Sequence, residues 1–129
     1  MESRIKAIVA KYSHDRTRLM DILHAVKDEF GYIPPEAIKH IALQLKMSVV
    51  DVEQTVSFYH FFSLNTRGKY SVYLNNSAVS CMMGRHELAS VFEKELGIPF
   101  NSVTEDGLVG LWDTADIGMN DQEPAAIIN

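Results

Sequence analysis

The chain has 129 residues, of which 47% are hydrophobic and 22% charged, which suits one globular domain or two small lobes. Its formal net charge is −5 and its twelve lysines and arginines are scattered, so nucleic acid is not an expected partner. Cys81 is the only cysteine, which excludes both an internal disulfide and a cluster held by four cysteines of this chain. No membrane span or secretion signal is recognisable, and a cytoplasmic location is expected.

The first two predicted helices are amphipathic. Their apolar residues recur three, four and seven positions apart, the spacing that places side chains on one helix face. The second helix is expected to end at Gly31, because a residue without a Cβ readily adopts the left-handed conformation found after many helices. The apolar positions are Ile5, Ile8, Val9 and Tyr12, and then Leu19, Ile22, Leu23, Val26 and Phe30.

Two further helices are expected before residue 60. Pro34 and Pro35 restart the chain as a third helix, since the fixed φ of proline suits the first helical turn. Ser48 opens the fourth, where its hydroxyl can accept a hydrogen bond from the backbone N–H of Asp51. The apolar residues expected to face the core are Ile38, Ile41, Ala42 and Leu45, followed by Val49, Val52 and Val56.

The second half of the chain predicts short strands around one helix. Residues 69–75 alternate between apolar and polar side chains, as in a strand with two distinct faces. Strands are also expected at 108–112 and 125–128. The helix between them ends at Gly97, and its apolar stripe is Leu88, Val91, Phe92 and Leu96.

The aromatic run at residues 58–62 has two interpretations. It could form a cofactor or base-stacking platform, but rings that wedge the helical part against the sheet are favoured, because each ring can bury a large area. His60 within the run is expected to be a hydrogen-bonded core or interface residue. No second histidine lies three or four residues away to complete a metal site.

Acidic residues gather near the C-terminal end of the chain. Their spacing does not fit a calcium-binding loop, which needs oxygen ligands at alternate positions and a central glycine. A solvated loop is therefore expected. The residues are Asp113, Asp116, Asp121 and Glu123.

Cys81 is the one side chain that could act as a nucleophile. It follows the strand at 69–75 and is expected at or before the start of the next helix, where the helix dipole would favour its thiolate. No Cys-x-x-Cys partner is present to resolve a mixed disulfide. An inert, partly buried cysteine is the favoured interpretation, and a single-cysteine thiol enzyme is an alternative.

Several segments, spread over nearly the whole chain, carry a resemblance. They are Gly31–Pro34, Ser57–Phe62, Gly68–Tyr70, Asn76–Gly84, Asp116–Asn120 and Pro124–Ala125. Together they resemble the thioredoxin-like 2Fe-2S ferredoxin subunit of respiratory complex I. The resemblance implies an α+β fold, with an N-terminal helical bundle (1–65) followed by a thioredoxin-like α/β lobe (66–129). The native chain is expected to continue past Asn129. Residues 66–129 are then either the whole of that lobe or a truncated part of it.

The resemblance also implies where a cluster would be held. It places the family's two cysteine pairs on Asn76 with Cys81 and on Asp116 with Asn120, so only one position retains a thiol. Iron in such clusters is held by anionic thiolates, and amide oxygens are poor substitutes. This domain is therefore expected to hold no metal and no cofactor. The alternative is a 2Fe-2S electron-transfer domain with unusual ligands, namely Cys81, Asp116 and a group from elsewhere.

Within the family, three segments are most similar to the N-terminal domain of the large diaphorase subunit of soluble NAD-reducing hydrogenases. They are Asp15–Leu19, Ser57–Phe62 and Asp121–Ala125. This likeness implies an adjoining part that binds FMN, NAD and a 4Fe-4S cluster, and other subunits as partners. The expected function is a cluster-free structural and docking domain of an NADH-oxidising or NAD-reducing complex. The complex is an oxidoreductase, and no catalytic residue is expected in this domain.

Overall fold

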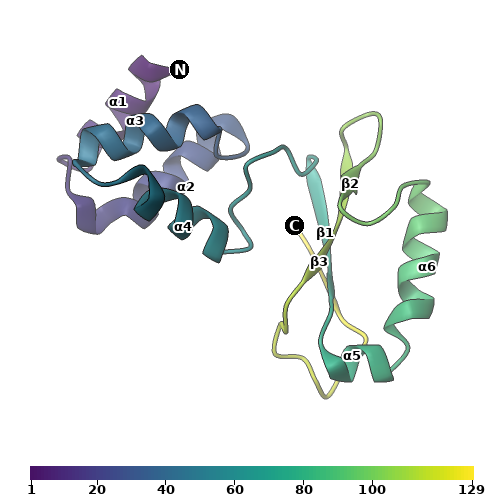
Figure 1. Cartoon of the computed structure of the whole chain (residues 1–129). Coiled ribbons are helices and arrows are strands. Elements are labelled where there is room, and N and C mark those ends of the chain that lie inside the picture. The colour runs from purple at the N-terminus through teal and green to yellow at the C-terminus, as the bar shows by residue number, and fades with distance from the viewer. The chain divides into compact units, whose positions relative to one another are not determined.

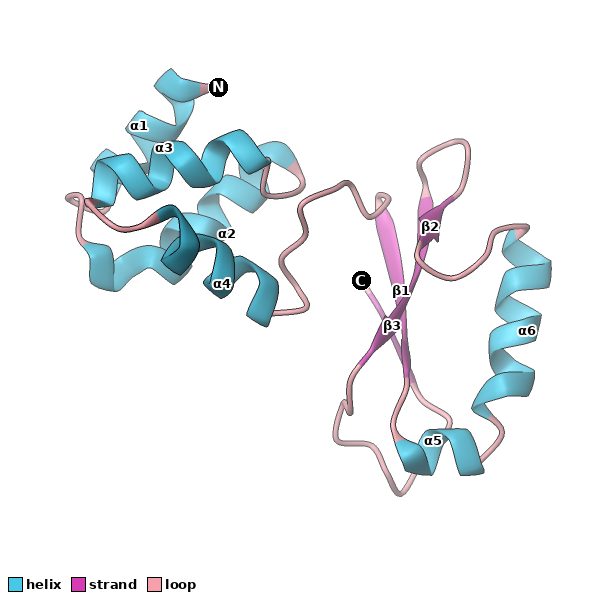
Figure 2. Ribbon diagram, viewed as in Figure 1, coloured by secondary structure: helices cyan, strands magenta, loops and turns pink.

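The computed structural model describes residues 1–129 and divides into two compact units, Met1–Thr66 and Arg67–Asn129 (Figure 1). The first unit is entirely helical and the second combines a small sheet with helices (Figure 2). No helix in either unit is both long enough and apolar enough to cross a membrane.

The helical unit contains all four helices predicted from the sequence, with a short 3-10 turn before the second. Gly31 ends the second helix in the left-handed conformation, at φ 79°, and the Ser48 hydroxyl accepts the backbone N–H of Asp51 at 3.0 Å. The predicted caps are therefore confirmed. The elements are α1 (Glu2–Lys11), η1 (Arg16–Arg18), α2 (Leu19–Phe30), α3 (Pro35–Leu45) and α4 (Val49–Phe58).

The core of the helical unit is built from the apolar faces of these helices. Burial of such side chains is the main favourable term in folding, about 1.5–3 kcal/mol each. One predicted core position is wrong: Val49 is 42% exposed, because it is the first residue of α4 and the core is reached only with Val52 and Val56. The largest fully buried side chains in this unit are Ile5, Ile22, Leu23, Ile33 and Ile41.

The aromatic run is divided between the core and the surface. Phe62 is buried in the helical core, and Tyr59 and Phe61 pack against that core. Phe58, by contrast, is 79% exposed. That these rings wedge the helical part against the sheet stays a prediction. His60 is also exposed and touches the Phe61 ring edge-on at 5.7 Å between centroids, so it is not a core histidine.

The second unit has a four-stranded sheet in the order β2-β3-β1-β4 (Figure 2). The central strands β1 and β3 are parallel, and each has an antiparallel neighbour at the edge. A parallel pair requires a crossover, and α5 and α6 supply it. The elements are β1 (Tyr70–Asn75), α5 (Ala78–Met82), α6 (Arg85–Leu96), β2 (Ser102–Val103), β3 (Val109–Thr114) and β4 (Ala126–Ile128).

Three details of this unit differ from the sequence prediction. Helix α5 and strand β2 were not expected, because five and two residues are too few to show a period. Strand β1 is central and buried along both faces, so its polar residues Ser71 and Asn75 are buried as well. On α6, Val91 is 54% exposed, and Ala89 is buried instead.

Candidate functional site at the carboxyl edge of the sheet

The four positions predicted to replace cluster ligands follow the ends of the two parallel strands. Asn76 directly follows β1, and Cys81 lies in α5 just beyond it, whereas Asp116 and Asn120 belong to the loop after β3. The two strands end in register, and the backbone N–H of Asn76 donates to the carbonyl of Thr114 at 2.9 Å. Both segments therefore leave the sheet at the same edge, where Figure 2 shows α5 and the loop after β3.

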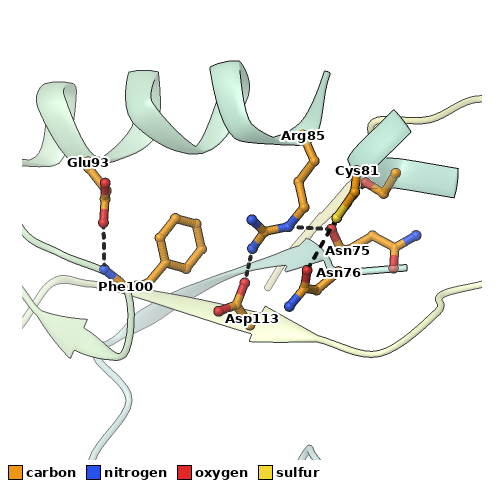
Figure 3. A network of polar contacts seen from close by, with 8 residues as sticks. Asn75, Asn76, Cys81, Arg85, Glu93, Phe100 and Asp113 are labelled. Atoms are coloured by element: carbon orange, nitrogen blue, oxygen red, sulfur yellow. Dashed lines mark hydrogen bonds and ion pairs between the residues drawn. The ribbon is translucent and has the colours of Figure 1, made fainter. Parts of the chain in front are cut away.

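Cys81 lies in a different local structure from the one predicted. It is the fourth residue of the five-residue helix α5, whose N-terminus is capped by the Ser77 hydroxyl accepting the N–H of Ser80 at 3.1 Å. The next helix begins only at Arg85, after Gly84. The expected support of the thiolate by a helix N-terminus is therefore wrong. The Sγ of Cys81 instead donates to Oδ1 of Asn76 at 3.7 Å (Figure 3).

Asp116 and Asn120 are bonded to each other within their loop. One Asp116 carboxylate oxygen accepts from the Asn120 amide at 3.0 Å, and the other accepts from the backbone N–H of Gly118 at 2.8 Å. Gly118 adopts φ 78°, a conformation that a residue without a Cβ takes without strain. The Asn120 amide first, and then the Gly118 N–H, hold the pKa of Asp116 below its ordinary value.

These donors do not match the needs of an iron-sulfur cluster. The chain has one cysteine, and the other three positions offer two amides and a carboxylate whose two oxygens both accept hydrogen bonds in their own loop. Four thiolates are the ordinary ligand set of a 2Fe-2S cluster. Nowhere do three or more His, Cys, Asp or Glu side chains gather in a way that could hold a metal ion.

A buried polar network lies directly behind this edge. The backbone carbonyl of Asn75, the last residue of β1, accepts from Nε of Arg85 at 3.0 Å and from the Ser80 hydroxyl at 3.1 Å. The Arg85 guanidinium also forms an ion pair with Asp113 of β3 and lies over the Phe100 ring, 5.3 Å from its centroid (Figure 3). One arginine therefore joins α6 to both parallel strands.

Glu123 extends the network to the segment before β4. It is buried, and its carboxylate accepts from the Asn75 side-chain amide and from the backbone N–H of Ala125 at 2.8 Å. The prediction of a solvated acidic loop is correct for Asp116 and Asp121, which are exposed. It is wrong for Glu123, and also for Asp113, which lies in strand β3 and is paired with Arg85.

Sequence reasoning did not identify Asn75, Ser80 or Arg85. Asn75 has the position of a polar residue on the open face of a strand, and Arg85 that of a charged residue in a first helical turn. Nothing in the local spacing indicates their burial, because their partners lie far away along the chain. Asn75 and Glu123 are 48 positions apart, and Arg85 and Asp113 are 28 apart.

Solved structures share this architecture. An air-oxidised NAD+-reducing NiFe-hydrogenase superposes with a TM-score of 0.70 at 25% sequence identity, covering 87% of this chain and 19% of that chain. The H2-reduced state of an NAD+-reducing NiFe-hydrogenase gives a TM-score of 0.69. The protein is thus an α+β protein with a helical bundle and a thioredoxin-like lobe.

The sequence profile of the thioredoxin-like 2Fe-2S ferredoxin family matches residues 5–129, and the chain belongs to this family. It is 43% identical over its full length to the alpha subunit of the NAD-reducing hydrogenase HoxS of Cupriavidus necator, but covers only 21% of that protein. It is 28% identical to one of the subunits of the NADH-quinone oxidoreductase of Aquifex aeolicus and covers 81% of it. The chain therefore spans about a fifth of the first relative and about four fifths of the second.

Proposed function

We propose that this chain is a cluster-free structural and docking domain of an NAD-linked redox complex. Its relatives are named as parts of an NAD-reducing hydrogenase and of an NADH-quinone oxidoreductase. In this proposal its partner is the module that binds FMN, NAD and a 4Fe-4S cluster, together with other subunits of a hydrogenase-type complex. The cytoplasmic location expected from the sequence stays a prediction.

The proposal rests mainly on the hydrogen bonds and the ion pair that join the segments at the carboxyl edge of the sheet. Asn75 is bonded to α5 through Ser80, to α6 through Arg85 and to the segment before β4 through Glu123. Arg85 adds the link to β3 through Asp113. Side chains of the protein thus connect the elements around the site to one another. The Oδ1 of Asn75 is buried without a hydrogen-bond partner, whereas the amide nitrogen of Asn75 and the side chains of Ser80, Arg85 and Glu123 are all bonded. Such a buried polar network favours one arrangement through the members that are satisfied.

The alternative of a 2Fe-2S domain with unusual ligands is less well supported. Asp116 would have to release at least one of its two loop hydrogen bonds in order to bind iron. Cys81 would have to give up its bond to Asn76. Even then the chain would offer one thiolate and one carboxylate, and the remaining ligands would have to come from elsewhere.

The alternative of a thiol enzyme is less well supported by the hydrogen bonding of the sulfur. Activated cysteines lie beside a histidine, a cation or a helix N-terminus, any of which favours the thiolate. The hydrogen-bond partner of Cys81 is a neutral amide, and Cys81 occupies the second half of its short helix. We therefore assign no catalytic role to Cys81.

Iron and acid-labile sulfide analysis of the 129-residue protein, prepared without oxygen, tests the cluster-free proposal. The expected protein is colourless and contains far less than one iron per chain. Two irons and two sulfides per chain, with the visible absorption of thiolate-to-iron charge transfer, would overturn the proposal. Oxygen-free preparation matters because a labile cluster could otherwise be lost during purification.

A further inference from the structure

The segment between α4 and β1 joins the two compact units, and Figure 2 shows it as a loop. The first part of this segment is anchored to the helical unit. Phe62 is buried in the helical core, and the carbonyl of Ser63 accepts a hydrogen bond from the backbone N–H of Ile33 at 2.7 Å. Ile33 is itself fully buried. The chain is therefore anchored to the helical unit as far as Ser63.

The last part of the segment is anchored to the second unit through the backbone of Arg67. The Arg67 carbonyl accepts two hydrogen bonds, from the Ser71 hydroxyl at 3.1 Å and from Nε1 of Trp112 at 3.2 Å. It lies so close to β3 that a Cβ on Gly110 would collide with it. Both donors and the glycine belong to the second unit, so the chain is anchored there from Arg67 onward.

The side chain of Arg67 contributes to the same anchor. Its guanidinium lies over the Trp112 ring, 5.0 Å from the centroid, and over the Tyr73 ring at 5.7 Å. A cation in this position is attracted by the negative face of an aromatic ring. One terminal nitrogen also donates to the Tyr73 hydroxyl at 3.4 Å, whereas Nε is buried without a hydrogen-bond partner. Two aromatic rings of the sheet thus hold the guanidinium.

Residues 64–66 lie between the two anchors. They belong to no helix or strand, and their hydrogen bonds are the two that Asn65 makes with Ser63, at 2.7 and 3.2 Å. Both bonds join residues two positions apart, so they extend neither anchor. Hinges in proteins are short loop segments of this kind, in which a few residues absorb the change in backbone dihedrals.

We propose that Leu64–Thr66 is a hinge about which the two units turn, with its ends fixed by Ser63 and by the contact of Arg67 with Trp112. Three residues span at most about 11 Å, so the hinge changes the orientation of the units more than their separation. Motion between two units joined by a loop is the default unless a large apolar interface prevents it. The inference goes beyond the proposed docking role and does not depend on it.

Residual dipolar couplings of the 129-residue protein, measured in one neutral and one charged aligning medium, test the hinge. Couplings from residues 1–63 and from residues 67–129 are fitted separately. A rigid molecule imposes one alignment magnitude on both units, whereas units that turn about a hinge align to different degrees. The expected result is two magnitudes that differ by more than the error of the fits. Equal magnitude and rhombicity for both units in both media would overturn the inference.

Backbone order parameters from 15N relaxation then locate the ends of the hinge. Values of about 0.85 are typical of rigid backbone and values below about 0.6 of flexible backbone. In the parent protein, low values are expected at residues 64–66 alone. Trp112→Phe keeps an aromatic ring but removes the Nε1 donor, and it is expected to extend the low values to Arg67 and Gly68. Tyr70→Phe, at the start of β1, is the matched control and should leave both values unchanged.

Two outcomes would overturn the ends assigned to the hinge. One is low order parameters beyond Thr66 in the parent protein. The other is unchanged values at Arg67 and Gly68 in a folded Trp112→Phe variant. Ser71→Ala removes the second donor to the Arg67 carbonyl and gives the same test where Trp112→Phe does not fold.

These outcomes are independent of the iron analysis. An iron-free protein whose units share one alignment magnitude and rhombicity would overturn the hinge alone. An iron-containing protein with two alignment magnitudes would overturn the cluster-free proposal alone.

Discussion

Arg85 is the residue on which the polar network of the second unit most depends. Its side chain is nearly buried and meets a backbone carbonyl, the Asp113 carboxylate and the Phe100 ring. A buried cation is stable only while such partners are present. Removing either charge of the pair leaves the other without its counterion.

We predict that Arg85→Met destabilises the protein by at least about 2 kcal/mol. Breaking a fully buried ion pair costs about 3–5 kcal/mol, and Asp113 is partly exposed, which reduces the loss. Denaturant unfolding measures the change, with Lys94→Met on the exposed side of α6 as control. A loss for Arg85→Met as small as that of the control, within about 0.5 kcal/mol, would show that the network contributes little.

We predict that Asn120→Ala raises the pKa of Asp116 toward its ordinary value of 3.8. The variant removes the largest cause of the lowered pKa and leaves the Gly118 N–H in place. A carboxylate with a lowered pKa in the folded state stabilises the protein above its unfolded pKa. That contribution is lost as the pH falls through the folded pKa. The variant should therefore lose less stability than the parent on acidification below about pH 4.

NMR titration of the Asp116 carboxyl carbon measures this pKa directly in both proteins. If the titration midpoints coincide, Asn120 does not bond to Asp116 in solution. In that case the loop geometry described above would be wrong.

The elements of the protein differ in how well the sequence predicts them. The four N-terminal helices follow from apolar periodicity together with local signals such as Gly31 and Ser48, whose effects extend only a few residues. Helix α5 has five residues, and its cap at Ser77 is not accompanied by a periodic apolar face. The register of β1 with β3 joins segments that are far apart in the sequence, and no local signal indicates it.

The residues of the candidate site also differ in how well the sequence predicts them. Cys81 and Asp116 could be identified as candidates from their residue types and from the resemblance. The burial of Asn75 and Glu123 could not, since it depends on which distant segments meet at the end of β1. Residue type and local spacing contain no information about contacts between segments that are far apart in the sequence.

We predict that the triple variant Asn76→Cys, Asp116→Cys, Asn120→Cys can be reconstituted with iron and sulfide. Four thiolates would then follow two parallel strands that end in register, with the Gly118 turn retained. Partial occupancy is expected, because hydrogen bonds that support the sulfurs of a working cluster have no reason to be present here. Visible absorption and iron content measure the result. A triple variant that folds but binds no more iron than the parent would show that the two segments do not form one site.

At the scale of the whole molecule, the chain has two compact units, and each contributes a different part of the proposed role. The helical unit is built around an apolar core, and the second unit retains the family's fold with a cysteine at only one of the four ligand positions. The protein would then retain the fold because a partner subunit binds to it.

We predict that Cys81→Ser leaves NADH oxidation by the assembled complex unchanged. The sulfur is bonded only to the Asn76 amide, and a serine hydroxyl can donate the same hydrogen bond. The free energy of unfolding should change by about 1 kcal/mol or less. Steady-state NADH oxidation is measured alongside subunit composition. Lost activity in a fully assembled complex would assign the thiol a redox role.

Electron paramagnetic resonance after anaerobic reconstitution with iron and sulfide tests the central claim most directly. The native sequence and the triple cysteine variant are treated identically and reduced with dithionite, so that the variant is the positive control for the site. The account predicts no signal of a reduced 2Fe-2S cluster from the native sequence. A signal from the native sequence that accounts for about one spin per chain, and that disappears with Cys81→Ser, would contradict it.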